Sequence, residues 1–517
     1  MATKKKSAKK AASKKTTSKK AVSKKVSVKK VTRSTRPAAT KGSAAKGRPI
    51  TPPLPQPKEE EEEVLPTMEP VVTSVKGMRD LLPMQQPTWQ RVRGVTERLA
   101  QAFGYLRIDT PAVEKTDLFV RGVGKATDIV EKEMYSFADA GKTSLSLRPE
   151  GTAGVIRAYI ENGLHTMPQP LKVYHSGPRY RRDRPQAGRY REFFQFDIDV
   201  IGSDQAAVDV EIMFILNKML SRLGLKDFRF HVNSIGCSEC RPTYVETLSS
   251  YYQGKKNALS EDDKKRLKNN PLRILDSKDE GAKKLAEDAP HFVDYLCEEC
   301  TKHFTSVLEY LDEGGVPYEL NPKIVRGLDY YNRTVFEVVY GAPDEANAEM
   351  VIASGGRYDG LMKLLGGHDM PAVGGSIGMD RVVAILDSLT EVGGADSFYK
   401  TRKVDVFFAQ LGDLAKKRTL PLLDKLVDAG LSAAFALNRD SLKSQLRLAD
   451  KYGARLALIL GQKEALDGTI LIRDMISGAQ ELIPSDSLLP EVRRRLASEP
   501  VKNAGASKKN SNVSKKK

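Results

Sequence analysis

The stretch from residue 171 to 201 constrains the fold of this chain more than any other part of the sequence. Two segments, 171–174 and 193–201, are rich in β-branched and aromatic residues and predict strands. The loop between them contains proline, glycine and six arginines from Arg179 to Arg191. This pattern predicts a hairpin with a basic loop. Guanidinium groups match phosphate oxygens, so the loop is suited to a nucleotide or an RNA backbone, and a solvated charged loop is the alternative.

The net charge of +18 is concentrated at the two ends of the chain. Residues 1–57 contain 18 lysines or arginines and no acidic residue, and residues 502–517 contain 6 more lysines and no acidic residue. Removing these 24 charges from +18 leaves about −6 for residues 58–501. The body of the chain is therefore slightly acidic, and nucleic-acid binding by it must depend on local basic clusters.

Residues 1–70 predict a disordered Lys-rich tail and a linker of proline and glutamate. Lys-Lys pairs recur every five residues from Lys9 to Lys30, and the residues between them bury too little apolar surface to offset the entropy of ordering. Five residues turn a helix by roughly 500°, so the lysines share no helix face. A solvated or RNA-attracting tail is therefore favoured over a transit peptide. Residues 498–517 predict a second disordered basic tail.

Residues 71–400 predict an α+β domain in which strand-like and helix-like segments alternate. A further strand is predicted at 335–340. Between about 236 and 321 the sequence changes to charged helices, which predicts a helical insertion in the strand-rich domain. Helices are predicted at 205–223, 261–269 and 280–287.

Residues 403–490 predict a separate, compact α/β domain. Its predicted strands are 404–409, 432–437, 456–460 and 469–472, and its predicted helices are 420–429 and 441–452. Strands that alternate with helices are typical of a largely parallel sheet. Arg439, Lys443 and Arg447 could contact phosphates, or they could be charges on a solvated helix.

Four cysteines occur as two pairs, Cys237 with Cys240 and Cys297 with Cys300, separated by 56 residues. Four thiolates with this spacing suit a structural, tetrahedral zinc ion in a reducing compartment. The alternative is four reduced cysteines that never meet. No run of about 18 apolar residues and no apolar secretory segment occur, so we expect a cytoplasmic protein with no membrane span.

Four further motifs accompany the arginine-rich hairpin. They are LRPEGTAG at 147–154, RGLDYYNRTVFE at 326–337, ASGGRYDGL at 353–361 and GSIGMDR at 375–381. In this order, the five segments resemble those of bacterial-type histidyl-tRNA synthetases, class II enzymes with an antiparallel catalytic sheet flanked by helices. The hairpin resembles class motif 2, the last segment resembles motif 3, and the two before it resemble the histidine-specific signatures. The resemblance extends from about residue 71 to 472.

The resemblance implies ATP-dependent activation of L-histidine to histidyl-adenylate and its transfer to the 3′ end of tRNA(His). Activation joins a carboxylate to the α-phosphate of ATP, so the site must neutralise charge and align two anions. The family pattern assigns this work to Arg181, Arg326 and Arg381. It assigns ATP binding to Arg181, Asp183, Asp380 and Arg381. ATP is expected to carry Mg²⁺.

The resemblance also implies a histidine pocket, which needs partners for two ring nitrogens and an ammonium group. The family pattern places in it Glu150, Gly151, Thr152, Arg181, Gln195, Asp199, Arg326, Tyr330 and Tyr331. The two tyrosines could instead be ordinary core aromatics. Gly355 and Gly356 are expected to let the backbone approach the ligand closely.

Three positions depart from the family pattern. Asp183, Asp199 and Asp380 stand where the family often has glutamate. Each side chain is one methylene shorter and keeps its charge, so we expect altered fine geometry and retained activity. The resemblance also implies that Arg184 and Gln186 lie near the acceptor end of the tRNA.

The resemblance further implies an anticodon-binding role for residues 403–490 and a homodimer formed through class motif 1, around 111–118. The main alternative is a catalytically inactive relative, a regulatory subunit of histidine biosynthesis. Such a chain should lack the C-terminal domain and lose Arg181, Arg326 or Arg381, and this sequence retains them all. A plain RNA-binding protein would explain the tails but not the histidine signatures.

Overall fold

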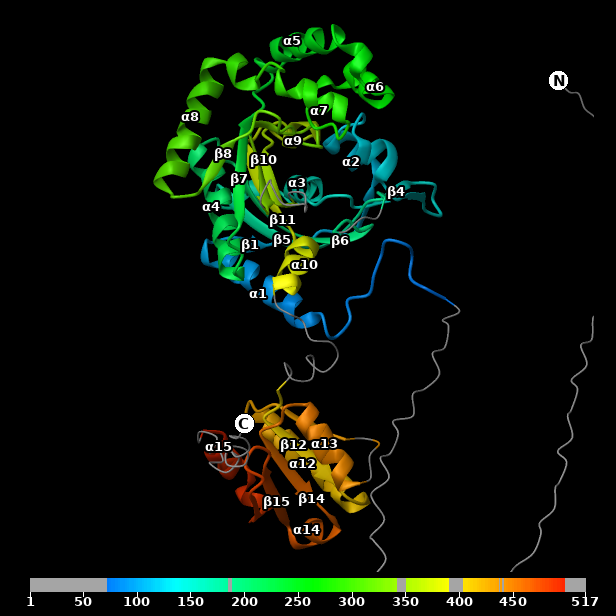
Figure 1. The fold of residues 1–517 in the computed structure, drawn as a ribbon, viewed down its shortest axis with the longest axis vertical. Coiled ribbons are helices and arrows are strands. Elements are labelled where there is room, and N and C mark those ends of the chain that lie inside the picture. The colour runs from blue at the N-terminus through cyan, green and yellow to red at the C-terminus, as the bar shows by residue number, and fades with distance from the viewer. Residues whose placement is uncertain are drawn as a thin grey trace, which may run out of the picture. The chain divides into compact units, whose positions relative to one another are not determined.

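The computed structural model describes residues 72–184, 188–341, 350–389, 403–436, 438 and 441–497. The predicted basic tails, together with Gln186 and Arg439, lie outside the described residues. No helix in these ranges is long and apolar enough to cross a membrane. Two regions with separate sheets, 72–389 and 403–497, are described in turn (Figure 1).

An eight-stranded sheet forms the centre of the first region, in the order β1-β5-β6-β11-β10-β9-β7-β8. The inner strands run antiparallel to their neighbours, and only the short edge strands β1 and β8 pair in parallel. This confirms the antiparallel catalytic sheet that the resemblance implied. The strands are β1 (Leu106–Arg107), β5 (Leu171–Tyr180), β6 (Glu192–Ile201), β7 (Phe228–Ser234), β8 (Tyr318–Leu320), β9 (Asn332–Tyr340), β10 (Met350–Arg357) and β11 (Ala372–Gly378).

The predicted basic hairpin is the β5–β6 pair, in which Tyr180 lies opposite Glu192. Side chains alternate along its strands, so the sheet has two different faces. On β6, Phe196, Ile198 and Val200 are fully buried in the main apolar core. Burying each of these side chains contributes about 1.5–3 kcal/mol to folding. The intervening residues of β6 face the opposite side of the sheet, where the polar site lies.

Three helices cover the apolar face of the sheet: α1 (Gln86–Ala102), α4 (Ala206–Leu223) and α10 (Met379–Leu389). The structure confirms the predicted helix at 205–223, which contributes Ile212, Leu216 and Met219 to this core. The chain's single tryptophan, Trp89 of α1, is buried in the same core.

A helical cluster stands at one end of this sheet (Figure 1). It contains α5 (Arg241–Gln253), α6 (Glu261–Asn269) and α7 (Glu280–Glu287). Ser260 caps α6 and Asp279 caps α7, since each side chain accepts a hydrogen bond from a backbone amide of the first turn. The predicted spans of α6 and α7 are confirmed.

Helix α8 (Glu298–Glu313) follows this cluster and packs against α4 in the main core. The other elements of the first region surround the polar face. They are β2 (Val113–Lys115), β3 (Ser136–Ala138), β4 (Ser144–Leu147), α2 (Thr116–Val123), α3 (Thr152–Glu161) and α9 (Leu361–Leu364).

The second region has a five-stranded sheet in the order β13-β12-β14-β15-β16. Its strands are β12 (Val406–Gln410), β13 (Ala433–Phe435), β14 (Leu456–Leu460), β15 (Thr469–Asp474) and β16 (Gln480–Pro484). Its helices are α12 (Asp413–Asp428), α13 (Leu442–Lys451), α14 (Gln462–Asp467) and α15 (Leu488–Ala497).

Two predictions for this second region are wrong. The sheet is mixed, not largely parallel, because β14, β15 and β16 run antiparallel and β15 and β16 form a hairpin. Helix α12 begins at Asp413, seven residues before the predicted start, and holds Pro421 in its interior. The polar run from Lys416 to Thr419 separates Leu414 and Ala415 from the later apolar residues of this helix, so the sequence pattern made the first turns resemble a loop.

Candidate active site

A cleft of about 660 Å³ opens on the polar face of the central sheet. The β5–β6 hairpin, the loop before β9, strand β10 and the start of α10 contribute to its walls. The three arginines assigned to the chemistry, Arg181, Arg326 and Arg381, all line it. Side chains that lie 200 residues apart in the sequence are thus brought to one cavity.

Arg181 extends from the end of β5. Its Nε donates to the backbone oxygen of Pro149 over 2.9 Å, and its guanidinium lies 5.2 Å from the centre of the Phe193 ring. Burial lowers the pKa of Arg181, and the carboxylates of Glu133 and Glu150 oppose this change. An arginine remains charged at neutral pH under such conditions, so the cleft keeps a fixed cation.

Arg326 lies in the loop between β8 and β9. Its Nη1 donates to Glu337 Oε1 at 2.5 Å, and its Nη2 donates to the Ser354 hydroxyl at 2.8 Å. Burial opposes its charge, but Glu337 together with Tyr331 and Tyr330 outweighs burial, so the pKa of Arg326 is raised. Its buried Nε has no hydrogen-bond partner within the described ranges. The side chain is therefore held from neighbouring strands and keeps a donor available.

Arg381 is the third residue of α10. Its Nε donates to the backbone oxygen of Gly188 at 3.3 Å, and its Nη1 donates to that of Val351. Burial lowers the pKa of Arg381, and the positive charges of Arg189 and Arg181 lower it further. The cleft thus holds several cations that repel one another. This arrangement is expected of a site that binds a polyanion.

The two aspartates assigned to ATP differ in their surroundings. Asp183 lines the cleft and accepts from Arg189 Nη1 over 3.2 Å. Asp380 accepts from Arg79 Nη2 at 2.7 Å and, through its other oxygen, from the amide of Phe194 at 2.5 Å. Burial raises the pKa of Asp380, and these hydrogen bonds oppose the change. Both of its oxygens are engaged, so Asp380 fastens the start of α10 to the hairpin.

Most residues assigned to histidine form a buried polar cluster beside the cleft. Glu150 accepts from the amides of Thr152 and Ala153 at the start of α3, over 2.8 and 2.9 Å. The Tyr330 hydroxyl donates to the same carboxylate over 3.4 Å. Burial raises the pKa of Glu150, although the two amides oppose this. Gly151 is required here, because a Cβ atom would lie 2.1 Å from the His175 ring.

Asp199 is also buried in this cluster, whereas Gln195 lines the cleft itself. Tyr358 donates to Asp199 Oδ1 at 2.5 Å. The other oxygen, Oδ2, has no hydrogen-bond partner in the described part of the chain, and His175 Nε2 lies 3.6 Å away. A buried carboxylate with a free oxygen is costly unless a ligand pairs with it.

Tyr330 and Tyr331 are packed with Tyr358, with ring centres 4.7–6.5 Å apart. They are therefore both core aromatics and part of the polar cluster. Burial and the nearby charge of Asp199 raise the pKa of Tyr358, so its hydroxyl stays protonated as a donor. The sequence motif contained Tyr358, but its role was not predicted.

Sequence reasoning also missed a set of buried charged and polar side chains next to this cluster. Fully buried Arg179 of β5 donates to Asp197 of β6 over 2.7 Å, and its Nη2 lies 2.6 Å from His175 Nδ1. The signal was available: His175 and Arg179 on one strand, and Asp197 and Asp199 on the next, recur at the even spacing that places them on one sheet face.

The glycines of the signature at 353–361 have a packing role that was not predicted. A Cβ atom on Gly355 would lie 2.2 Å from the Gly374 oxygen and 2.5 Å from the Phe336 ring. One on Gly356, whose φ is 155°, would lie 2.6 Å from the Thr334 oxygen. The glycines therefore allow adjacent strands to pack, and that they let the backbone approach a ligand stays a prediction.

Arg357 in the same signature forms a buried ion pair. Its Nη2 lies 2.5 Å from Asp209 Oδ2 on α4, and its Nη1 lies 3.1 Å from Asp359. Arg357 and Asp209 are both fully buried. The pair ties the end of β10 to the start of α4.

Residues of the helical cluster line the cleft opposite the hairpin, and the sequence did not reveal this. Arg266, Arg273 and Lys278 contribute cations there, together with Asp276. Burial raises the pKa of Asp276, and the charges of Arg273 and Arg326 oppose the change. The cluster and the sheet thus contribute to one charged cavity.

The residues predicted to contact tRNA are solvent-accessible where the structure describes them. Arg184 follows Asp183 in the hairpin loop and is exposed, and Gln186 lies outside the described residues. Lys443 and Arg447 are exposed on α13.

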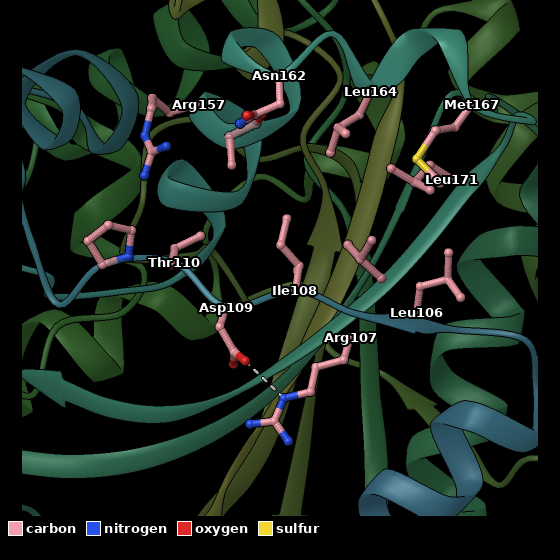
Figure 2. A pocket seen from close by; sticks show the side chains of 13 residues that line it. Leu106, Arg107, Ile108, Asp109, Thr110, Arg157, Asn162, Leu164, Met167 and Leu171 are labelled. Carbon is pink, nitrogen blue, oxygen red and sulfur yellow. Dashed lines mark hydrogen bonds and ion pairs between the residues drawn. The ribbon is translucent and has the colours of Figure 1, made fainter.

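A second cavity, of about 420 Å³, lies beside the edge strand β1 (Figure 2). Leu106 and Met167 line it and are largely exposed, while the Arg107 Nε donates to Asp109 over 3.0 Å along its rim. Its lining holds no convergent set of acids, bases or nucleophiles comparable to that of the first cleft. We treat it as a surface depression with apolar walls.

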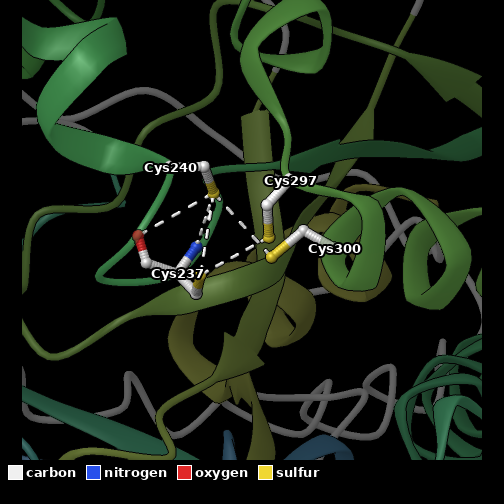
Figure 3. A group of neighbouring side chains, drawn as sticks. All are labelled: Cys237, Cys240, Cys297 and Cys300. Carbon is white, nitrogen blue, oxygen red and sulfur yellow. Dashed lines mark hydrogen bonds between the residues drawn. The ribbon is translucent and has the colours of Figure 1, made fainter.

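The four cysteines lie together, with all four sulfur atoms within 4.8 Å of one another (Figure 3). The alternative in which they never meet is therefore wrong.

Comparison with known proteins gives consistent matches. A family model described as histidyl-tRNA synthetase matches residues 77–382, and one described as an anticodon binding domain matches residues 405–495. A histidine–tRNA ligase of Desulforamulus reducens is 41% identical over 425 residues, covering 82% of this chain and 100% of that protein. A histidine–tRNA ligase of Nitratidesulfovibrio vulgaris is 42% identical over 418 residues, covering 81% and 97%.

Solved structures agree with these matches. The apo histidyl-tRNA synthetase of S. aureus matches with a TM-score of 0.67 and 30% identity, over 82% of this chain and 100% of that one. A Bacillus halodurans protein described as an ATP phosphoribosyltransferase regulatory subunit/histidyl-tRNA synthetase matches with a TM-score of 0.54 and 20% identity, over 76% and 99%. The latter likeness shows the fold alone.

Proposed function

This chain belongs to the histidyl-tRNA synthetase family, and we propose that the cleft on the polar face of its central sheet is where L-histidine is activated. The family's reaction is ATP-dependent ligation of histidine to tRNA(His), and the chain has both the catalytic and the anticodon-binding domain. The observation that supports the assignment to this cleft is the convergence of Arg181, Arg326 and Arg381 beside a buried cluster of carboxylates and phenols.

The three guanidinium groups lower the cost of bringing two anions together. A carboxylate oxygen of histidine attacks the α-phosphorus of ATP, the bond from that phosphorus to the oxygen of the leaving pyrophosphate breaks, and histidyl-adenylate forms. Negative charge accumulates on the phosphate oxygens during this step, and preorganised cations stabilise it there. Arg181 and Arg326 are held by hydrogen bonds from several elements, so they need little reorganisation when the substrates bind.

The buried cluster is suited to recognise an imidazole. Asp199 offers an unpaired oxygen and Glu150 offers a carboxylate held at the start of α3, so acceptors are available for ring N–H groups. Gln195 lies where the cleft meets the cluster and can contact the ammonium end of the amino acid. A ligand without matching donors would leave Asp199 buried and unpaired, which gives strong discrimination.

ATP binds with Mg²⁺, which supplies positive charge to the phosphates. The carboxylates of Asp183 and Glu337 line the cleft and fit the oxygen ligands that this ion prefers. Asp380 supports ATP binding indirectly, since it holds the segment that carries Arg381. Arg184 and Gln186 in the hairpin loop are proposed to contact the acceptor end of the tRNA.

We further propose a homodimer that covers the surface around the second cavity (Figure 2). Two apolar side chains that line this cavity are exposed, Leu106 by 52% and Met167 by 38%. Edge strand β1 is only two residues long and leaves the side of β5 lightly covered. Exposed apolar surface next to a sheet edge favours association with a second copy. We also place the enzyme in the cytoplasm, because its proposed substrates are ATP, histidine and tRNA.

Histidine-dependent exchange of pyrophosphate into ATP tests the proposed site. The unmodified chain should catalyse exchange, and Arg326→Ala should slow it by at least about 100-fold, as expected when one preorganised charge is removed from a transition state. Arg222→Ala, which removes an exposed arginine of α4, is the matched control and should leave exchange unchanged. Exchange at full rate in Arg326→Ala would contradict the assignment of this cleft.

A further inference from the structure

The four cysteines occupy the two ends of the helical cluster. Cys237 and Cys240 follow strand β7, and Cys240 is the residue directly before α5. Cys297 directly precedes α8, and Cys300 lies in the first turn of that helix. One pair therefore lies where the helical cluster begins in the sequence, and the other lies where it ends. The two pairs lie side by side (Figure 3).

The spacing of the sulfur atoms is that of ligands around one ion. The distances from Cys237 Sγ to Cys240 Sγ, from Cys237 Sγ to Cys297 Sγ and from Cys240 Sγ to Cys300 Sγ are all 3.8 Å. A tetrahedron with a Zn–S distance of ~2.3 Å has edges of about 3.8 Å. All four cysteines are free. A [4Fe–4S] cluster would place each thiolate on a different iron, and a [2Fe–2S] cluster would divide the four thiolates between two irons, so either cluster would hold some of the sulfur atoms farther apart than one ion does.

The backbone around the first pair is arranged to stabilise thiolates. The amide of Cys237 donates to Cys240 Sγ over 3.2 Å, and the amide of Glu239 donates to Cys237 Sγ over 3.4 Å. Gly236 makes the tight turn possible, because its φ is 58° and a Cβ atom there would lie 2.5 Å from Cys240 Sγ. Amide donors that point at sulfur favour an anionic ligand over a neutral, buried thiol.

We propose that these four thiolates bind one structural zinc ion, which fastens the entry and the exit of the helical cluster to each other. Four sulfur ligands leave no open coordination position, so the ion has no catalytic role. Binding releases the thiol protons, and zinc undergoes no redox change.

The site is also joined directly to the start of β9. Arg241 Nη2 donates to the backbone oxygen of Tyr331 over 2.6 Å, and the amide of Arg333 donates to the oxygen of Gly236 over 2.9 Å. Zinc therefore also steadies Tyr331, which is proposed to shape the histidine pocket. This functional consequence rests on the proposed function, whereas the metal site does not.

Metal analysis of the full-length chain tests the site. Protein purified with a thiol reductant, without chelator and without added metal, should contain about one zinc ion per chain. Reconstitution of metal-free protein with Co²⁺ should give the intense thiolate-to-cobalt charge-transfer absorption of a four-sulfur site. Cys240→Ser and Cys300→Ser should each lose most of the zinc.

The matched control is Leu248→Ala, which removes a fully buried side chain of α5 and no ligand. It should keep its zinc although it lowers the stability of the cluster, which separates loss of a ligand from loss of packing. Less than about a tenth of a zinc ion per chain, both as purified and after incubation of the reduced protein with zinc chloride, would overturn the proposal. Iron in place of zinc, or disulfides within the pairs, would overturn it as well.

Pyrophosphate exchange by zinc-free protein tests the consequence separately. A KM for histidine raised several-fold, with recovery when zinc is restored, supports the connection through Tyr331. An unchanged KM in a protein that otherwise binds one zinc would overturn only that connection. Loss of exchange in the zinc-bound, unmodified chain would instead contradict the proposed function.

Discussion

Among the side chains of the site, Asp199 and Tyr358 form the contact with the clearest consequence. Asp199 is buried, one of its oxygens accepts from Tyr358, and the other has no hydrogen-bond partner in the described ranges, with His175 Nε2 3.6 Å away. The hydroxyl thus holds the carboxylate in one orientation while leaving one oxygen for the ligand. Tyr358 is a positioning residue in this arrangement.

We therefore expect Tyr358→Phe to raise the KM for histidine about 10-fold, since loss of one hydrogen bond to a charged, buried group costs roughly 1.5 kcal/mol or more. The KM for ATP should change little, because Tyr358 does not line the cleft that holds Arg381. Pyrophosphate exchange at varied histidine and varied ATP measures both constants. Tyr252→Phe in α5, also fully buried, is the control and should change neither. Equal changes in both constants would indicate general disruption of the fold.

Some residues of the site could be predicted from the sequence because of their chemistry, and others could not. The arginines of the cleft belong to motifs whose residue types match an anionic substrate, so Arg181, Arg326 and Arg381 could be chosen without coordinates. Arg179 has the same side chain, but it is fully buried and pairs with Asp197. Which arginine of a basic loop faces the ligand and which supports the sheet depends on strand register, and the motif does not contain that information.

Among the helices and strands, the junction of α4 with β10 depends on a buried ion pair. Arg357 and Asp209 are fully buried, and without Asp209 the guanidinium would keep only the partly exposed Asp359 as a carboxylate partner. Burial raises the pKa of Asp209, but His303 and Arg357 outweigh it, so the pKa is lowered overall. The carboxylate therefore stabilises the folded state at pH values above its unfolded pKa of ~3.9, and this contribution is lost as the pH falls through the lower, folded value.

Asp209→Asn should lower the free energy of unfolding by about 3–5 kcal/mol at pH 7, because it leaves a charged Arg357 buried without its partner. The difference from the unmodified chain should narrow as the pH falls below ~4 towards the lower, folded pKa of Asp209, because the unfolded chain takes up the proton first. Urea unfolding followed by the fluorescence of Trp89 reports on this core alone, since it is the chain's single tryptophan. Asp359→Asn is the control and should cost less, because Asp359 is partly exposed. A pH-independent difference would argue against the ion pair.

Elements with strong periodicity were predicted well. Helices α4, α6 and α7 and strands β6 and β14 lie within a residue of their predicted bounds, because regular apolar spacing or capping residues define them locally. Strand direction was not predictable in the second region. A helix between two strands suggests a parallel crossover, but α14 has only six residues, and the chain returns as antiparallel strand β15. Such pairing is determined by contacts across the fold.

In the chain as a whole, the positive charges that could attract RNA are concentrated in the two terminal segments of the sequence, apart from the residues proposed for catalysis. Residues 1–57 carry 18 positive charges, whereas residues 58–501 carry a net charge of about −6. The cations of the proposed active site lie in the cleft, so we expect them to act in activation without the terminal lysines.

Removing residues 1–57 should leave histidine-dependent pyrophosphate exchange unchanged and raise the KM for tRNA several-fold at low salt. The reason is that lysine and arginine side chains that bind phosphates release counterions from the RNA backbone, so their contribution should weaken as salt increases. Aminoacylation measured across a range of salt concentrations tests this. Replacing the same lysines by glutamine is the matched control and should have the same effect as removal. An unchanged KM and salt dependence would show that the tail does not attract tRNA.

Because side chains alternate between two faces along β6, single-residue insertions and deletions within this strand should not be tolerated. Phe196, Ile198 and Val200 belong to the apolar core, and Gln195 and Asp199 belong to the reactant side. A codon inserted within this strand would exchange the two sets, so that carboxylates entered the core and the substrate met hydrocarbon. Lengths should therefore be invariant in the inner strands among functional relatives, and insertions and deletions should be confined to the loops between them.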